Sequence, residues 1–219
     1  PHKHWAHQIS ISLEGDIVVL TGKQSITGKA LFIQANTTHS LQPSLTLSIY
    51  LDPSTVFAKR ITSLISNHST VCEIPYDLAQ SILDCFKDKE DMKDGARALQ
   101  QSYSADEKPR LKSRSDVVLS RLQDILTGAV VTRNELAELT CLSPSRFSHW
   151  FKEETGMPLR SYRKWLHLIH GIETVLIGES FHMAAHTANF SDQAHFTRTF
   201  KQAFGESPSV VLANIQNMR

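Results

Sequence analysis

The sequence has no long apolar run, and its cysteines are few and scattered. A membrane-spanning helix needs about 20 consecutive apolar residues, and no window of the chain comes near that length. No segment resembles a signal peptide. The three cysteines, Cys72, Cys85 and Cys141, lack the spacing of metal ligands. We therefore expect reduced thiols in a cytoplasmic protein that has no membrane partner.

The chain also lacks an excess of positive or of negative residues. The chain has 23 Lys and Arg residues against 22 Asp and Glu residues, a net charge of +1, and from Ser115 onward the counts are 10 and 10. This balance counts against a nucleic-acid-binding protein on bulk charge alone, so a DNA-binding face would have to come from where the charges lie. No activated nucleophile, phosphate-binding glycine loop or pair of carboxylates stands out, and we expect no enzyme and no catalytic residue.

Short apolar runs separated by turn residues dominate the beginning of the chain. The runs cover residues 8–13, 17–20, 30–34 and 45–51. This spacing predicts a small antiparallel sheet or barrel. The apolar period then becomes helical, which predicts two helices at about 55–68 and 75–89, with Pro75 at the start of the second.

A polar segment divides the chain. Residues 95–114 are rich in charge and contain Gly95 and Pro109, a composition typical of a solvated linker or a loosely held helix more than of a core element. It separates a domain over residues 1–94 from a helical domain over 115–219.

One pattern occurs twice in the C-terminal domain. Phe147-Ser-His-Trp-Phe-Lys-Glu-Glu-Thr-Gly156 recurs as Phe196-Thr-Arg-Thr-Phe-Lys-Gln-Ala-Phe-Gly205, at an offset of 49 residues. Upstream, Leu136-Ala-x-x-Thr140 is echoed by Met183-Ala-x-x-Thr187, which leaves two extra residues before the second helix. The repeat predicts two copies of a helix, a tight turn and a second helix.

Helical geometry separates a buried from an outward face in each copy. The predicted buried residues are Phe147, Trp150, Phe151, Phe196, Phe200, Ala203 and Phe204. Ser143 followed by Pro144 is a helix start, and Ser191 or Asp192 starts the second helix. The polar, positively biased outward faces suit the major groove. The predicted DNA-binding residues are Ser145, Arg146, Ser148, His149, Lys152, Gln193, Ala194, His195, Thr197 and Arg198.

The segments Leu142–Gly156 and Phe190–Pro208 resemble the AraC/XylS family of bacterial transcription regulators, and the resemblance covers about residues 115–216. It implies seven helices, with two helix-turn-helix subdomains joined by a long helix at about 161–177. It implies base contacts by six of the outward residues, namely Ser145, Ser148, His149, Gln193, Ala194 and Arg198. Double-stranded DNA and RNA polymerase would be the partners. The family usually has Arg at His167, Ala at Gly171 and Gly at Asn189.

The histidines near the start of the chain form a second pattern. His2-x-His4-x-x-x-Gln8, followed by Gly15, resembles the first cupin motif, and His39 falls where a second motif would supply its histidine. Side chains two apart on a strand share a face, so these residues could meet. Three interpretations stay open: a pocket for a small effector, a divalent metal site, or inherited barrel residues without a ligand. We favour the effector pocket and commit to no cofactor.

The sequence thus predicts an α+β protein: a small antiparallel, cupin-like β-barrel with helices, then an all-α domain with two helix-turn-helix units. The favoured function is a sequence-specific transcription regulator that responds to a small molecule in the barrel. Alternatives are a metal-dependent cupin enzyme fused to a DNA-binding domain, and a ligand-independent DNA-binding protein. Two interpretations stay open for four apolar residues of the second predicted helix, a homodimer contact or plain core: Leu78, Ile82, Leu83 and Phe86.

Overall fold

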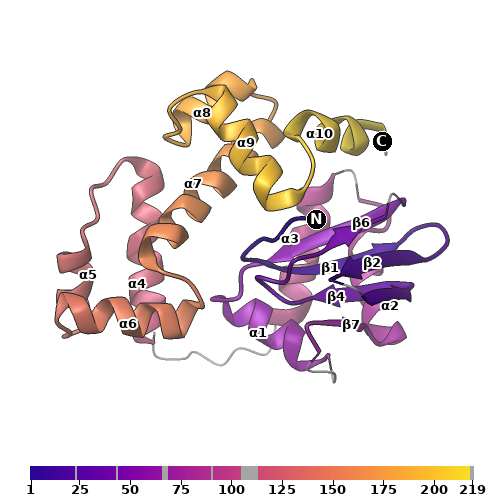
Figure 1. The fold of residues 1–219 in the computed structure, drawn as a ribbon, viewed down its shortest axis with the longest axis horizontal. Helices are drawn as coiled ribbons and strands as arrows, with labels where there is room; N and C mark the ends of the chain where they lie inside the picture. The colour runs from indigo at the N-terminus through magenta and orange to yellow at the C-terminus, as the bar shows by residue number, and fades with distance from the viewer. Residues whose placement is uncertain (23, 43, 66–68, 90, 105–112, 218–219) are drawn as a thin grey trace. The chain divides into compact units, whose positions relative to one another are not determined.

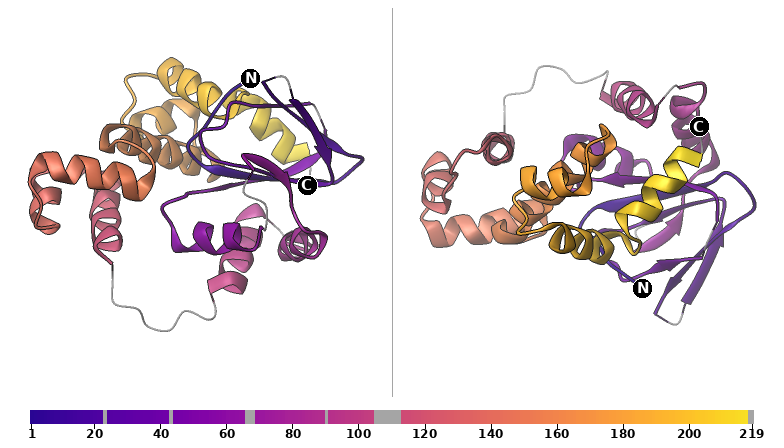
Figure 2. Two further views of the ribbon diagram at one scale, coloured as in Figure 1. Left: turned by 60° about the horizontal axis from the view of Figure 1, so that its bottom comes forward. Right: turned by 90° about the horizontal axis from the view of Figure 1, so that it is seen from above.

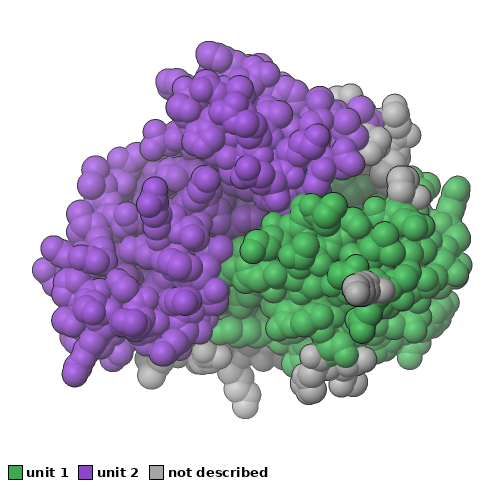
Figure 3. All heavy atoms as spheres, in the orientation of Figure 1, with its two compact units in different colours: residues 1–110 green, residues 111–219 purple. Residues whose placement is uncertain are grey.

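The chain divides into two compact units, Pro1–Arg110 and Leu111–Arg219, which Figure 3 shows in different colours. The computed structural model describes residues 1–22, 24–42, 44–65, 69–89, 91–104 and 113–217. We call the two parts unit 1 and unit 2.

Unit 1 is built on two antiparallel sheets (Figures 1 and 2). Its strands are β1 (His7–Ser12), β2 (Ile17–Thr21), β3 (Gln24–Gly28), β4 (Ala30–Ile33), β5 (Ser40–Leu41), β6 (Thr46–Leu51) and β7 (Val71–Glu73). The larger sheet has the order β6-β1-β4-β7 and the smaller sheet the order β3-β2-β5. The α+β class is confirmed, but the described strands form two separate sheets and not one closed barrel. The edge strands β5 and β7 have only two and three residues.

The two faces of the larger sheet are both buried. Ile9 and Ile11 on β1 point to one face and pack with the helices of unit 1. Gln8 and Ser10 lie opposite Ile33 and Leu31 of β4 in the strand register, so they share the other face with the apolar core between the two sheets. The polar side chains of Gln8 and Ser10 on β1 are thus inside the protein. A strand that alternates apolar and polar residues more typically has its polar face in water.

Three helices cover the Ile9 face of the larger sheet: α1 (Val56–Ser63), α2 (Tyr76–Phe86) and α3 (Met92–Ser104). Helices α1 and α2 are the two predicted ones. Helix α3 lies in the segment predicted to be a linker, yet its Leu99 is 3% exposed in the core of unit 1. Gly95 is the reason for the close packing, because a Cβ there would lie 2.2 Å from the ring of Phe86. The polar stretch is therefore a helix of unit 1 up to Ser104.

Unit 2 is helical throughout its described part. Its elements are α4 (Arg114–Gln123), the 3-10 helix η1 (Asp124–Thr127), α5 (Arg133–Leu139), α6 (Pro144–Thr155), α7 (Leu159–Leu176), α8 (Phe181–Thr187), α9 (Gln193–Phe204) and α10 (Pro208–Asn217). The long helix α7 has α4, α5 and α6 at one end and α8, α9 and α10 at the other (Figure 1). Among the described residues, no helix combines the length and the apolarity that crossing a bilayer requires.

Candidate nucleic-acid interface

Helices α6 and α9 begin and end in the same way. The Ser143 side chain caps α6 by accepting a hydrogen bond from the Arg146 backbone N–H, and Pro144 occupies the first helical position. The Asp192 carboxylate caps α9 by accepting from the backbone N–H of His195 at 2.6 Å. Each helix has 12 residues and is followed by a left-handed glycine, Gly156 or Gly205. The structure confirms the predicted start of α6 and chooses Asp192 for α9.

The turns that precede the two helices are also alike. Cys141 and Asn189 adopt positive φ angles of 53° and 56°. In both turns the next residue donates its backbone N–H over 2.9 Å to a carbonyl of the preceding helix: Leu142 to Ala137, and Phe190 to Ala185. The left-handed residue stops the first helix of each pair and aims the chain at the next.

This geometry corrects the predicted alignment upstream of the turns. Ala137 and Ala185 are equivalent and both are buried, whereas the sequence match had paired Ala137 with Ala184. Equivalent residues before the turn are therefore 48 positions apart and not 47. Because the repeats after the turn are 49 positions apart, the second turn has one extra residue instead of two. The alignment based on identical or similar residues was wrong, because it paired Leu136 with Met183, which is 42% exposed.

In both copies, buried aromatic side chains define the inward face of the second helix, α6 or α9. Phe147, Phe151, Phe196 and Phe200 are buried, as predicted. Phe151 contacts Tyr162 of α7 edge-on, with ring centroids 5.5 Å apart. In the second copy Phe190 contacts Phe196 at 5.4 Å. The other predicted core residues, Trp150, Ala203 and Phe204, are only half-buried.

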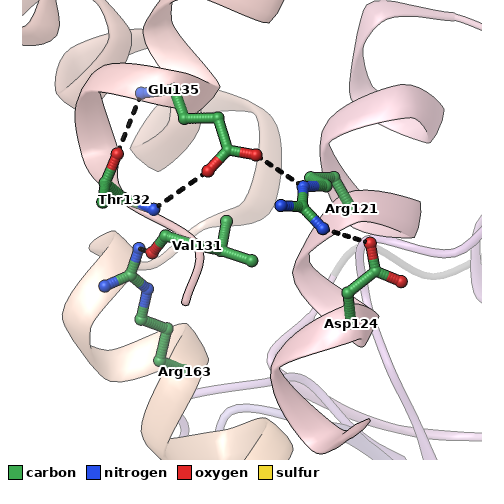
Figure 4. Close-up of polar contacts among 6 residues, drawn as sticks. All are labelled: Arg121, Asp124, Val131, Thr132, Glu135 and Arg163. Carbon is green, nitrogen blue, oxygen red and sulfur yellow. Dashed lines mark hydrogen bonds and ion pairs between the residues drawn. The ribbon is translucent and has the colours of Figure 1, made fainter. Parts of the chain in front are cut away.

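A polar network that the sequence reasoning missed holds the first helix-turn-helix unit in place (Figure 4). Arg121 of α4 binds Asp124 and Glu135, each at 2.6 Å. Glu135 also accepts from the backbone N–H of Thr132, which caps α5. From α7, Arg163 donates to the carbonyl of Val131 at 2.6 Å. The capping box Thr132-x-x-Glu135 was the signal available in the sequence.

The second helix-turn-helix unit approaches α7 at Gly171. A Cβ at this glycine would lie 2.6 Å from the ring of Phe196 and 3.1 Å from Cβ of Ala188. The departure from the usual Ala thus has a packing reason, since only glycine leaves room for α9 at this distance. His167, the other departure on α7, is half-buried, and burial lowers its pKa.

The predicted contact residues lie on the outward faces of α6 and α9. On α6, Ser145, Arg146, His149 and Lys152 are exposed, and on α9 Gln193, Ala194 and Arg198 are exposed. Ser148, His195 and Thr197 are half-buried. The Ser148 hydroxyl donates to the Pro144 carbonyl at 2.9 Å, so only its lone pairs are available to a ligand. The His195 ring nitrogen lies 3.1 Å from the Ser191 hydroxyl, which steadies the imidazole at the start of α9.

The four residues predicted for an effector pocket meet inside unit 1. Gln8, His4 and His39 are 2%, 4% and 1% exposed, and His2 lies beside them, with its ring centroid 4.4 Å from that of His39. They contact one another. Two hollows in unit 1, of about 400 and 540 Å³, lie next to α2 and include none of these residues.

Comparison with known proteins agrees with this geometry. Residues 136–214 match the family described as a helix-turn-helix domain. The arabinose operon regulatory proteins of Salmonella typhimurium and Escherichia coli are each 30% identical to this chain over 105 residues. The match covers 46% of this chain and 36% or 35% of those proteins, so the chain spans about a third of the length of the curated relatives it matches.

Solved structures of ToxT from Vibrio cholerae are similar to nearly the whole chain. An apo ToxT variant has a TM-score of 0.61 at 11% identity, over 98% of this chain and 92% of that chain. Wild-type ToxT with a bound unsaturated fatty acid has a TM-score of 0.59 at 11% identity, over 99% and 90%. At this identity the likeness shows a shared fold.

Unit 2 therefore contains a helix-turn-helix domain, and the fold and the sequence repeat define it as one with two such motifs on a common linking helix. The matched part of the chain is similar to the arabinose operon regulatory proteins, and the predicted resemblance to the AraC/XylS family is confirmed.

Proposed function

We propose that the protein is a sequence-specific DNA-binding transcription regulator that acts in the bacterial cytoplasm. The observation that carries the proposal is the pair of equally long, equally capped helices α6 and α9, each with a buried aromatic face and an exposed polar face. Two such helices on one linking helix suit two successive turns of the major groove.

The side chains divide into two proposed roles. Arg198 has the fork of donors that pairs with guanine, Gln193 can pair with adenine, and the methyl of Ala194 suits thymine. Arg146, His149 and Lys152 on α6 present positive charge or donors to the backbone and to base edges, with Ser145 beside them. Because Ser145 and Ser148 are short, we propose that α9 discriminates between sequences more strongly than α6.

Unit 1 is proposed to bind a small effector and to modify DNA binding or the recruitment of RNA polymerase. A homodimer is also part of the proposal, but its contact must use surface residues. Leu78 and Ile82 are buried in the core of unit 1, and Leu83 and Phe86 pack against that core. Tyr76 at the start of α2, which is 76% exposed, is a better candidate for a contact.

A regulator is favoured over a metal-dependent enzyme fused to a DNA-binding domain. An enzyme of that kind needs an open position beside its metal where a substrate can enter. His4, Gln8 and His39 are almost completely buried, and the hollows beside α2 do not reach them. The arrangement therefore supports a sensor more than a catalyst.

Selection of bound duplexes from a random DNA pool tests the proposed function. The full chain should enrich a site with two short conserved blocks about one helical turn, roughly 10 base pairs, apart. The block read by α9 should be the more strongly conserved of the two. Failure to enrich any sequence, with a folded protein and at low salt, would contradict sequence-specific binding.

A further inference from the structure

His195 is held in one orientation in the first turn of α9. It is the third residue after the capping Asp192, whose carboxylate accepts the His195 backbone N–H at 2.6 Å. Its ring meets Phe190 edge-on, with centroids 5.1 Å apart, and Phe190 packs in turn on the buried ring of Phe196 at 5.4 Å. Nδ1 of His195 lies 3.1 Å from the Ser191 hydroxyl. The imidazole is therefore fixed by an aromatic contact and by a hydrogen bond.

The Ser191 hydroxyl has one hydrogen to give, and two groups compete for it. Its oxygen lies 3.3 Å from Oδ2 of Asp192 as well as 3.1 Å from Nδ1 of His195. The backbone N–H of His195 lowers the pKa of Asp192, which keeps the carboxylate ionised. An ionised carboxylate can only accept, and hydrogen bonds to a charged acceptor are stronger than those to a neutral one. The Ser191 hydrogen therefore goes to Asp192.

This choice decides the tautomer of His195. Since the Ser191 hydroxyl has given its hydrogen to Asp192, it can only accept from the ring, and Nδ1 of His195 must carry the hydrogen of that bond. In a neutral imidazole the other nitrogen, Nε2, is then an acceptor. Among the residues that the structure describes, Ser191 is the only hydrogen-bond partner of the ring. The side chain of His195 thus presents a fixed acceptor.

The position of His195 places this acceptor among the residues proposed to read bases. The first residues of a recognition helix are the ones that contact base edges in the major groove. His195 is half-buried, so part of its ring stays at the surface. It lies three positions before Arg198, and residues at this spacing are neighbours on a helix surface. Arg198 has only donors, which suit guanine, whereas Nε2 of His195 suits a base that presents a donor.

The donors of the major groove are the exocyclic amines of two bases. Adenine presents its N6 amine and cytosine its N4 amine, whereas guanine and thymine present a carbonyl oxygen. An acceptor that faces this part of a base is paired by adenine or cytosine and repelled by guanine or thymine. Because the ring of His195 is already held in place, little side-chain freedom is lost when it pairs.

We propose that Nε2 of His195 accepts a hydrogen bond from the exocyclic amine of an adenine or a cytosine, and that Ser191 positions the ring for this role. The inference rests on the proposed function and deepens it, because α9 would then read an amino base beside the guanine proposed for Arg198. Ser191 is a positioning residue, since it acts through the imidazole and not on the DNA.

The first test measures the tautomer without DNA. Nuclear magnetic resonance of the full chain with isotope-labelled histidine, in mildly alkaline buffer, reports which ring nitrogens carry hydrogen, and H195N identifies the signals of His195. Nδ1 should be protonated and Nε2 should not. S191A should shift the balance toward a protonated Nε2, whereas S120A, which removes an exposed serine of α4, is the matched control and should leave it unchanged. A protonated Nε2 in the unmodified protein would overturn the proposal.

The second test uses the DNA site obtained by selection. At one position beside the guanine of Arg198, the unmodified protein should prefer adenine or cytosine to guanine or thymine. An analogue that lacks only the exocyclic amine should weaken binding about three- to ten-fold, as the loss of one hydrogen bond should. H195N keeps a donor for Ser191 but has no group in place of Nε2, so it should bind both duplexes equally. S191A should retain part of the preference, and S120A all of it.

The outcomes separate this inference from the proposed function. An enriched site at which H195N changes no base preference, or removes a preference for guanine or thymine, would overturn the role of His195 and leave sequence-specific binding intact. Failure to enrich any sequence would instead overturn the proposed function, and the base-reading role of His195 with it.

Discussion

Arg198 is the side chain of α9 with the strongest means of reading a base. It is exposed and lies about one and a half turns after the capped start of the helix. A guanidinium that pairs with both acceptors of a guanine contributes about 1–3 kcal/mol of discrimination.

The substitution R198A should weaken binding to the selected DNA site by about 1–3 kcal/mol and relax the preference at one base position. Binding isotherms on the selected site and on a scrambled duplex measure both effects. R97A, which removes an exposed arginine of unit 1, serves as the control. Equal affinities for R198A and the control would remove Arg198 from the interface.

Gly171 decides how closely α9 packs on α7. The substitution G171A adds a methyl 2.6 Å from the buried ring of Phe196. Overpacking costs about 1–3 kcal/mol, and the gain in helix propensity offsets about 1 kcal/mol. We expect a net loss of about 1 kcal/mol in the free energy of unfolding, measured with a chemical denaturant.

The double variant G171A/F196L tests the cause of that loss. A smaller side chain at 196 leaves room for the new methyl, so the two changes together should cost less than their sum. K164A, at an exposed position of α7, should leave stability nearly unchanged. Strict additivity of G171A and F196L would show that the clash is not the reason for the glycine.

At the scale of elements, the contact between α4 and α5 depends on one carboxylate. Arg121 donates to Glu135 and lowers the pKa of that carboxyl group. A pKa that is lower in the folded state contributes stability above the unfolded pKa of about 4.3, and this stability is lost as the pH falls through the folded pKa.

The stability of the protein should therefore decrease as the pH is lowered from about 6 to 3, and E135Q should show a smaller decrease. Denaturant titrations across this range measure the slope. Asp192, whose pKa is lowered by the backbone N–H of His195, contributes to the same decrease and stays intact in E135Q. Identical pH profiles for E135Q and the unmodified protein would contradict a stabilising role for the Arg121–Glu135 pair.

The elements that could be predicted are those with strong local signals. Helices α6 and α9 have a repeated aromatic period, a capping side chain and a terminal glycine, and the structure agrees with all three. For α3 the sequence left a linker or a loosely held helix open, and the packing of this helix into the core was missed. Its surface is charged and glycine is typical of loops, although Gly95 serves a close contact. Strand β7 was missed because three residues are too few for a period.

The histidine cluster was predictable only in part. Two histidines two residues apart suggest a shared face, and His39 was a reasonable third member. The tertiary fold decides that Nε2 of His4 and of His39 lies beside the Gln8 amide oxygen. It also decides that the Nδ1 atoms of these two rings lie beside backbone carbonyls. The bridge between His2 and His39 joins segments that no local pattern connects.

At the scale of the whole molecule, the neutral charge limits non-specific binding. The 23 basic and 22 acidic residues leave a net charge of +1. Non-specific affinity for DNA comes mainly from released counterions, so we expect strong binding only at a matching sequence.

The substitution K152A should weaken binding to all DNA sequences by a similar factor and lower the slope of log K against log salt by about 1. Titrations at several salt concentrations on the selected site and on random DNA measure the slope. R198A should instead act mainly on the selected site. A sequence-dependent effect of K152A would assign this lysine to base contacts and not to phosphate contacts.

Helices α6 and α9 have the same length and the same kind of ends, so their outward residues are exchangeable in principle. Each runs for 12 residues between a capping side chain and a left-handed glycine, so the outward residues of one have counterparts in the other at a constant offset. Transplanting Gln193, Ala194 and Arg198 onto positions 144, 145 and 149 would leave the aromatic packing untouched. A protein altered in this way should read the same short block twice, which would turn an asymmetric operator preference into a tandem repeat.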